Sequence, residues 1–212
     1  MRGRLITLEG VEGVGKSSIV PVVEEYLQEQ GIEAVVTREP GGTALGEQLR
    51  EVLLNTDQEI VPTAELLLMA AARAQHIEKV IEPALKRGCW VVCDRFIDSS
   101  YAYQGGGREL GTDRVLQLEK WLLGSLRVDL TLLLDVTRET SLARTGKRAA
   151  LDRIEKEGDE FFDRVRHAFL NRSNRVARIQ IIDANPEFEV VSKAVRAKLE
   201  EAISVWREVE PA

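Results

Sequence analysis

The sequence predicts an α/β fold: a doubly wound parallel sheet of five strands flanked by helices, in a single domain over residues 1–212. Short apolar runs alternate with longer stretches of helical periodicity from one end of the chain to the other. The apolar runs lack the polar alternation of a half-exposed sheet, so they fit a parallel sheet that is covered on both faces. No linker, internal repeat or low-complexity tract interrupts the pattern, which indicates one domain.

Each predicted strand is a run of apolar or β-branched residues that leads into a loop. Ligands of doubly wound sheets bind beyond the carboxyl ends of the strands. The residues that follow each strand are therefore the first candidates for chemistry. In chain order, the predicted strands are residues 5–8, 34–37, 89–94, 130–136 and 179–183.

The predicted helices begin and end at recognisable residues. Gly31 ends the first helix, and a loop follows the second strand because Pro and paired Gly occur there. Thr63 caps the longest helix, with Glu65 behind it, and Pro83 bends its end. The start of this helix is apolar nearly all round, so we expect it to be buried. The predicted helices are residues 18–30, 45–54, 63–86, 99–107, 113–123, 137–145, 160–176 and 187–207.

The composition is typical of a water-soluble globular protein, with 44% hydrophobic and 30% charged residues, a net charge of −6 and a pI of about 5.2. Such a chain lacks the basic field that non-specific nucleic-acid binding requires, so no nucleic-acid partner is expected. It has no apolar run of about 18 residues, which argues against a membrane span. It also lacks an apolar leader, so the cytoplasm is the expected location.

The cysteines and histidines give no sign of a disulfide or a zinc site. On a strand, Cys89 and Cys93 would lie about 13 Å apart, too far for a disulfide. We expect both to be buried free thiols. His76 and His167 are isolated in the sequence, without the spacing of a structural zinc site.

The most specific motif is Gly10-x-x-x-x-Gly15-Lys16-Ser17, between the first predicted strand and the first predicted helix. This is a phosphate-binding P-loop in its expected context, which favours it over a flexible glycine-rich turn. Backbone N–H groups can turn toward phosphate oxygens, Lys16 can reach the β- and γ-phosphates, and the Ser17 hydroxyl can bind Mg²⁺. We therefore expect a nucleoside triphosphate to bind at Gly10, Val11, Glu12, Gly13, Val14, Gly15, Lys16, Ser17 and Ser18.

Three charged residues lie where they could complete a site. Asp94 ends an apolar strand, where a carboxylate can hold Mg²⁺, although Asp at a strand end is also a common turn former. Arg95 suits a two-point grip on a second phosphate, and the alternative is an ion pair with Asp94 or Glu12. Arg73 lies among alanines on the buried helix, and a desolvated arginine needs an anion nearby.

Two further segments allow two interpretations each. Ser99, Ser100, Tyr103 and Gln104 could together contact a base edge and enclose a sugar, although each alone is more typical of plain surface or packing. Residues 146–158 are rich in charge. They form either a solvated charged face or a lid that brings arginines to a transferring phosphoryl group.

Together these motifs resemble those of bacterial thymidylate kinases, which are P-loop nucleoside monophosphate kinases. The segments concerned are Gly10 to Ser18, Thr37-Arg38-Glu39-Pro40-Gly41-Gly42-Thr43, Arg73-Ala74-Gln75, Asp94-Arg95-Phe96, Ser99-Ser100-x-Ala102-Tyr103-Gln104-Gly105 and Leu151-Asp152-Arg153. They follow the family's order and spacing over nearly the whole chain. The resemblance implies a P-loop kinase fold with a short lid near residues 146–158, and a homodimer. It also implies Mg²⁺-dependent phosphoryl transfer from ATP to dTMP, giving ADP and dTDP.

The resemblance also implies roles for single residues. Arg95 would bind the dTMP phosphate, Arg73 and Ser100 the thymine; Glu12 would lie near the 3′-hydroxyl, and Tyr103 would crowd the 2′ position. The implied dTMP-binding residues are Glu12, Glu39, Met69, Arg73, Arg95, Ser100, Tyr103 and Gln104. The implied metal ligands are Ser17 and Asp94, and the implied catalytic residues are Lys16, Arg95, Arg148 and Arg153.

Members of the family differ in where the catalytic arginine lies. Gly13 and its neighbours provide no arginine within the P-loop, so the resemblance implies that the lid supplies it. Two features depart from the family's pattern. The lid has Gly146 and Lys147 where related lids often carry more arginine, and the second departure is at Met69. Met69 occupies a position that is usually a phenylalanine stacked on thymine. A thioether contacts an aromatic face with different geometry, so we expect looser stacking of the base.

Two alternative functions remain open at this stage. One is a P-loop kinase that acts on another nucleoside monophosphate or a deoxynucleoside. The other is a nucleotide-binding switch without transferase activity. The sequence contains no Asn-Lys-x-Asp guanine motif, and a pure binder would not need Arg73, Arg95 and a basic lid together.

Overall fold

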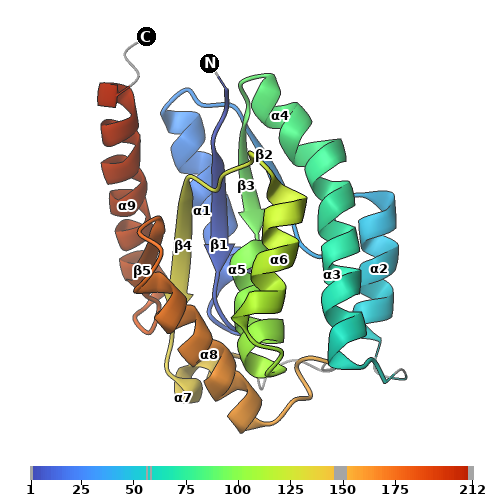
Figure 1. The fold of residues 1–212 in the computed structure, drawn as a ribbon. Helices are drawn as coiled ribbons and strands as arrows, with labels where there is room; N and C mark the ends of the chain where they lie inside the picture. Colours follow the sequence, from blue (N-terminus) through green and yellow to red (C-terminus); the bar gives the residue numbers. More distant parts are fainter. Residues whose placement is uncertain (1, 56, 58, 146–151, 210–212) are drawn as a thin grey trace.

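All five strands lie in one parallel sheet, in the order β2-β3-β1-β4-β5 (Figure 1). The computed structural model describes residues 2–55, 57, 59–145 and 152–209. The strands are β1 (Leu5–Glu9), β2 (Ala34–Arg38), β3 (Trp90–Asp94), β4 (Leu130–Asp135) and β5 (Ile179–Asp183). The predicted α/β fold with a five-stranded parallel sheet is confirmed.

Helices cover both faces of the sheet (Figure 1). On one face α1 (Lys16–Glu29) packs against α9 (Phe188–Val209). The other face carries α3 (Pro62–His76), α6 (Thr112–Leu123) and α8 (Asp159–Ser173), with α2 (Ala44–Leu54) packed on α3. The remaining elements are the π-helical turns η1 (Ile77–Ile81) and η2 (Tyr101–Gly107) and the helices α4 (Glu82–Lys86), α5 (Ile97–Ser100) and α7 (Arg138–Thr145).

Alternate side chains of β1 belong to different parts of the core. Ile6 and Leu8 are fully buried in the cluster that includes Val23 of α1 and Val195 of α9. Leu5 is buried in a second cluster with Ile81. Because side chains alternate between the faces of a strand, burial of consecutive residues requires helices on both sides. This explains why the predicted strands are apolar throughout.

The long helix predicted over residues 63–86 differs from the structure in three ways. Thr63 does not cap it: α3 begins at Pro62 after Val61, without a side-chain cap, because the fixed φ of proline suits a first helical turn. The helix passes through η1 into α4, where Pro83 cannot donate the hydrogen bond that a regular α-helix needs. It is also not buried all round, since Leu67 is 54% exposed.

Cys89 and Cys93 are both free and buried, as predicted. Within the described ranges, none of the helices is both long and apolar enough to cross a membrane.

The register of the parallel strands brings the carboxyl ends of β1, β2 and β3 to one edge of the sheet. Leu8 pairs with Asp94, and Arg38 pairs with the same residue from the other side. The loops that follow β1, β2 and β3 therefore begin next to one another. This is the edge at which a doubly wound sheet binds its ligands.

Candidate active site

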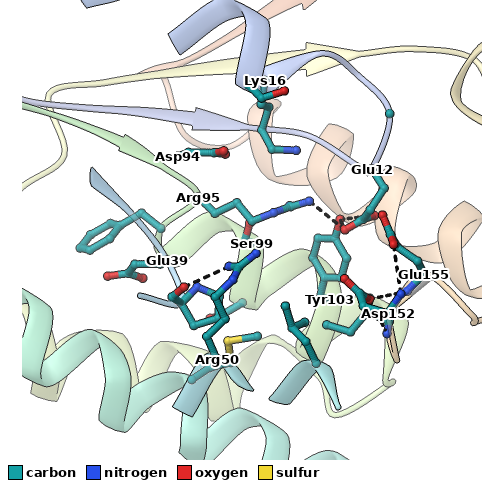
Figure 2. A pocket seen from close by; sticks show the side chains of 18 of the residues that line it. Glu12, Lys16, Glu39, Arg50, Asp94, Arg95, Ser99, Tyr103, Asp152 and Glu155 are labelled. Atoms are coloured by element: carbon teal, nitrogen blue, oxygen red, sulfur yellow. Dashed lines mark hydrogen bonds and ion pairs between the residues drawn. The ribbon is translucent and has the colours of Figure 1, made fainter. Parts of the chain in front are cut away.

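A cavity of about 420 Å³ opens at this edge of the sheet (Figure 2). It lies between the loop after β1, the loop after β2, helix α3 and the segment after β3. The predicted site residues that line it are Glu12, Gly13, Gly15, Lys16, Ser17, Ser18, Glu39, Met69, Arg73, Asp94, Arg95, Ser100, Tyr103 and Gln104. Gly10, Val11 and Val14 belong to the same loop but do not line the cavity.

The P-loop depends on glycine at defined positions. Gly10, Gly13 and Gly15 have φ of 136°, 75° and 93°, in a region that residues with a Cβ rarely adopt. A Cβ at Gly10 would lie 2.4 Å from the carbonyl oxygen of Leu134. Only glycine therefore lets the loop turn so close to β4 and lead directly into the N-terminus of α1.

Lys16 is buried at the start of α1, and its ammonium group fills the loop. Nζ donates to the carbonyl oxygens of Gly10 at 3.0 Å and Val11 at 3.1 Å. Burial, followed by the nearby charge of Arg95, lowers the pKa of Lys16 from 10.5 to about 8. An anion at this position would relieve both effects, as expected of a phosphate-binding lysine.

Arg95, Glu12 and Tyr103 form a charged cluster in the cavity (Figure 2). Arg95 donates to Glu12 Oε1 at 2.8 Å and to the Gly10 carbonyl at 2.9 Å, and its guanidinium lies over the Tyr103 ring. Tyr103 Oη donates to both oxygens of Glu12, at 2.8 and 2.7 Å. Of the interpretations open for Arg95, the structure contains the ion pair with Glu12 and places that pair in the cavity.

The arginine is also held in an uncommon backbone conformation. Arg95 has a φ of 66°, which is rare for a residue with a Cβ. Burial opposes its charge, but Tyr103 and Glu12 outweigh burial and raise its pKa, so the guanidinium stays charged. Such a fixed cation, oriented by its neighbours, can bind a second phosphate without rearranging the backbone.

Arg73 forms the buried end of the cavity. It is 3% exposed, and its Nε donates to Glu39 Oε2 at 2.7 Å, so it has the nearby anion that the sequence predicts. Nη1 donates to Ser100 Oγ at 2.8 Å and Nη2 to the Phe96 carbonyl at 2.9 Å. These bonds orient the planar guanidinium toward a wall that Met69 also lines.

Of the two predicted lid arginines, the structure describes Arg153. Arg148 lies outside the described residues. Arg153 does not line the cavity; it donates to Glu65 Oε2 at 2.6 Å and to the Leu53 carbonyl at 2.8 Å. Glu65 also accepts from Gln104 at 2.9 Å, so Arg153 and a predicted acceptor residue share one buried carboxylate. The structure thus connects the described part of the predicted lid to the wall of the cavity.

The surroundings of Asp94 bear on its predicted role as a Mg²⁺ ligand. Asp94 Oδ1 is buried and has no hydrogen-bond partner in the described part of the chain. A buried carboxylate oxygen needs a partner, and a hydrated cation supplies one. No group of three or more His, Cys, Asp and Glu within the described residues could hold a metal by itself. The residues therefore fit an ion that takes further ligands from Ser17, water and a nucleotide.

Sequence reasoning missed two arginines of the cavity. Arg50, on α2, donates to the Pro40 carbonyl at 3.0 Å and lies opposite Lys16 in Figure 2. Arg144, at the end of α7, donates to the Ala184 carbonyl at 2.8 Å. No motif indicates either residue. Each lies on a helix, and the pattern of apolar residues does not determine closely how that helix is rotated about its axis.

A third missed residue is Glu9, the last residue of β1, which is fully buried. Its carboxylate accepts from the backbone of Phe96 at 2.8 Å and from Ser99 Oγ at 2.5 Å. Burial and the neighbouring charge of Asp98 raise the pKa of Glu9 to about 7. A charged residue at the end of an apolar strand was the available signal. The contacts show that Glu9 holds the turn that carries Arg95.

The site combines a P-loop for one set of phosphates with an arginine-lined pocket for a second ligand, in one cavity. This arrangement defines the class as a P-loop kinase, which positions two substrates and neutralises the charge of the group transferred between them.

Comparisons with known proteins identify the family within that class. A family model described as thymidylate kinase matches residues 8–195, and the chain belongs to the thymidylate kinase family. Thymidylate kinase of Alkalilimnicola ehrlichii is 53% identical over 208 residues, covering 97% of this chain and 96% of the relative. That of Nitrosospira multiformis is 49% identical, covering 94% and 98%. The crystal structure of thymidylate kinase from Ehrlichia chaffeensis superposes with a TM-score of 0.76 at 30% identity, covering 94% and 99%.

Proposed function

We propose that this chain transfers the γ-phosphoryl group of ATP to dTMP, giving ADP and dTDP. The observation that carries the proposal is the shared cavity, in which the P-loop faces a pocket built from Arg73, Ser100, Arg95 and Tyr103. Membership of the thymidylate kinase family supports dTMP as the acceptor and ATP as the donor.

The two substrates would occupy different parts of the cavity. The P-loop and Lys16 hold the ATP phosphates at the N-terminus of α1, where the helix dipole favours anions. Arg95 binds the phosphate of dTMP, and Arg73 with Ser100 contacts the thymine. Glu12 and Tyr103 enclose the sugar. Met69 lies against the base, with looser stacking than an aromatic ring would give.

The reaction needs no covalent bond to a side chain. An oxygen of the dTMP phosphate attacks the γ-phosphorus, and the bond from that phosphorus to the β–γ bridging oxygen breaks. The attacking phosphate, whose second pKa is about 6, is already largely ionised at neutral pH. Lys16 and Arg95 hold the two phosphate groups in place against their mutual repulsion, which is the main catalytic requirement of phosphoryl transfer.

Ser17 and Asp94 would hold the Mg²⁺ ion. When bound, the ion supplies positive charge to the β- and γ-phosphate oxygens. The buried Oδ1 of Asp94, without a partner among the described residues, supports this assignment. Titration of ATP in the presence and absence of Mg²⁺ tests it, because Asp94→Asn is expected to weaken the Mg²⁺ dependence, and an unchanged dependence would contradict the assignment.

The lid would supply the arginine that neutralises charge on the transferring phosphoryl group. We keep Arg148 and Arg153 as its candidates, since the P-loop contains no arginine. Arg153 would have to exchange Glu65 for a phosphate, whereas the bond to Glu65 also suits a role in holding the lid segment. If Arg148→Ala and Arg153→Ala both leave kcat unchanged, the lid does not supply a catalytic group.

We also propose that the chain acts as a homodimer in the cytoplasm. Helices α3 and α6 are neighbours (Figure 1). Each exposes a large apolar side chain, Leu67 at 54% and Trp121 at 79%. Pairing two such surfaces would remove both side chains from water. Light scattering is expected to give twice the chain mass of 23.7 kDa, and a monomer would contradict this assignment.

One assay separates transfer from simple binding. The chain, ATP, Mg²⁺ and dTMP are incubated together, and the nucleotides are separated by ion-exchange chromatography. The proposal expects dTDP and ADP in equal amounts. A nucleotide-binding switch would yield ADP without dTDP, or neither product.

The affinity for ATP is expected to depend on the protonation of Lys16. Its pKa of about 8 in the structure means that the ammonium form predominates below that pH. Phosphates favour the charged form, so affinity should begin to fall as the pH approaches about 8 and continue to fall as the pH rises further. Calorimetric titration of ATP measures this. Lys16→Arg should lack the decrease, and an unchanged wild-type affinity up to pH 9.5 would contradict the assignment.

A further inference from the structure

A buried chain of hydrogen bonds runs behind the acceptor pocket. Thr37 Oγ1 lies 2.7 Å from His76 Nε2, and His76 Nδ1 lies 2.9 Å from Glu39 Oε1. The other oxygen of Glu39 accepts from Arg73, which in turn donates to Ser100. The chain joins β2 and the loop after it to α3 and α5. His76, which looks isolated in the sequence, stands at its centre.

The chemistry of the partners determines the direction of these bonds. Glu39 forms an ion pair with Arg73, and a carboxylate only accepts hydrogen bonds. Nδ1 of His76 must therefore donate to Glu39. In the neutral imidazole Nε2 is then the acceptor, and the Thr37 hydroxyl donates to it.

The contact between His76 and Glu39 is fully enclosed. His76 is 0% exposed and Glu39 is 4% exposed, so bulk water has little access to the bond between them. The loop after β2 also rests on the imidazole, since a Cβ at Gly42 would lie 2.6 Å from His76 Nε2. Without the imidazole, Oε1 of Glu39 would lose its partner and the carboxylate could turn away from Arg73.

We propose that His76 is a positioning residue of the acceptor site: by holding Glu39, it fixes the guanidinium of Arg73 against Ser100 and thereby sets the affinity for the acceptor nucleotide. This inference rests on the proposed function, in which Arg73 and Ser100 contact the base. His76 does not line the cavity, so its effect would pass through Glu39.

Two substitutions separate positioning from packing. When Asn replaces His, its amide nitrogen takes the place of Nδ1; when Gln replaces His, its amide nitrogen takes the place of Nε2. His76→Asn therefore keeps a donor to Glu39, and His76→Gln keeps only the contact with Thr37. His167→Gln is the matched control, because His167 is exposed and, among the described residues, its side chain bonds within its own helix, to the Asp163 carbonyl at 3.0 Å.

We expect His76→Gln to raise the KM for dTMP about tenfold, the effect of roughly one buried hydrogen bond to a carboxylate. His76→Asn should stay within about twofold of wild type on the same grounds. The KM for ATP should not change in either variant. Steady-state kinetics with each substrate varied in turn measures these values, and thermal unfolding checks the fold.

A packing role predicts the opposite order, because Gln is closer to His in volume and should be tolerated better than Asn. Equal or reversed KM values for dTMP would overturn the proposal. If His76→Asn does not fold, Thr37→Val replaces it, since Val has nearly the shape of Thr and leaves the bond to Glu39 intact. The KM must then be higher in His76→Gln than in Thr37→Val. A wild-type chain that does not phosphorylate dTMP would contradict the proposed function instead, and calorimetric titration of the acceptor that the chain does use would then test His76.

Discussion

Replacing Lys16 with Met is expected to lower kcat by about 10³-fold or more, because phosphoryl transfer relies on fixed positive charge at the β- and γ-phosphates. Nζ of Lys16 already lies inside the P-loop, on the carbonyls of Gly10 and Val11. Phosphate oxygens only have to replace these acceptors. The methionine side chain has no charge and no N–H group, so it cannot bind the phosphate oxygens in this way.

The fold should survive the same substitution. Burial disfavours the ammonium group of Lys16, as its lowered pKa of about 8 indicates, so an apolar side chain of similar length removes that penalty. The midpoint of thermal unfolding is expected to be no lower than that of wild type. Lys193→Met, on the exposed side of α9, is the control and should leave kcat unchanged. A Lys16→Met variant with normal kcat would exclude the P-loop as the donor site.

Replacing Arg95 with Ala is expected to lower kcat/KM for dTMP by about 10²- to 10³-fold, the size of a lost charge-assisted contact in a buried site. The arginine lies between the P-loop and the acceptor pocket and is oriented by Glu12, Tyr103 and the Gly10 carbonyl. Truncation also leaves Glu12 without its cation. The KM for ATP should change much less, because the P-loop itself stays intact.

Arg95→Lys provides the matched control for charge. Lysine keeps the positive charge but lacks the planar fork that binds phosphate at two points, so it should restore only part of the activity. Steady-state kinetics with dTMP as the varied substrate compares the three proteins. Equal kcat/KM for dTMP in wild type and Arg95→Ala would remove Arg95 from the acceptor site.

The fold was largely predictable because its signals are local. Apolar runs in the sequence predict the strands. Because Asp94 ends its predicted strand, it is expected at the edge of the sheet where β1 ends with Glu9. The helix after residue 61 was less predictable, since a cap and a π-helical turn depend on packing partners that are far away in the sequence. Leu67 shows the same limit, because an apolar residue does not reveal whether a neighbour covers it.

The position of the site was predictable where a motif has fixed residue types at fixed spacing, as in the P-loop. It was not predictable where the role depends on a distant partner. Arg153 bonds to Glu65, 88 positions earlier in the chain, and nothing in the spacing of either residue indicates that pair. Glu9 and His76 act on neighbours in space, Phe96 and Glu39, so their functions become visible only when the loops are placed.

The central claim is that one cavity phosphorylates dTMP in preference to other nucleoside monophosphates. The most direct measurement is kcat/KM for dTMP, dUMP, UMP and AMP, each with ATP as donor in one coupled assay of ADP release. We expect dTMP to be the best acceptor. UMP should be at least about 100-fold poorer, because Tyr103 crowds the ribose 2′ position and no methyl group fills the base pocket. The kcat/KM for AMP should also be at least about 100-fold lower, because a purine differs in size and polar edge from the thymine that Arg73 and Ser100 are proposed to contact. A kcat/KM for UMP or AMP equal to or above that for dTMP would contradict the claim.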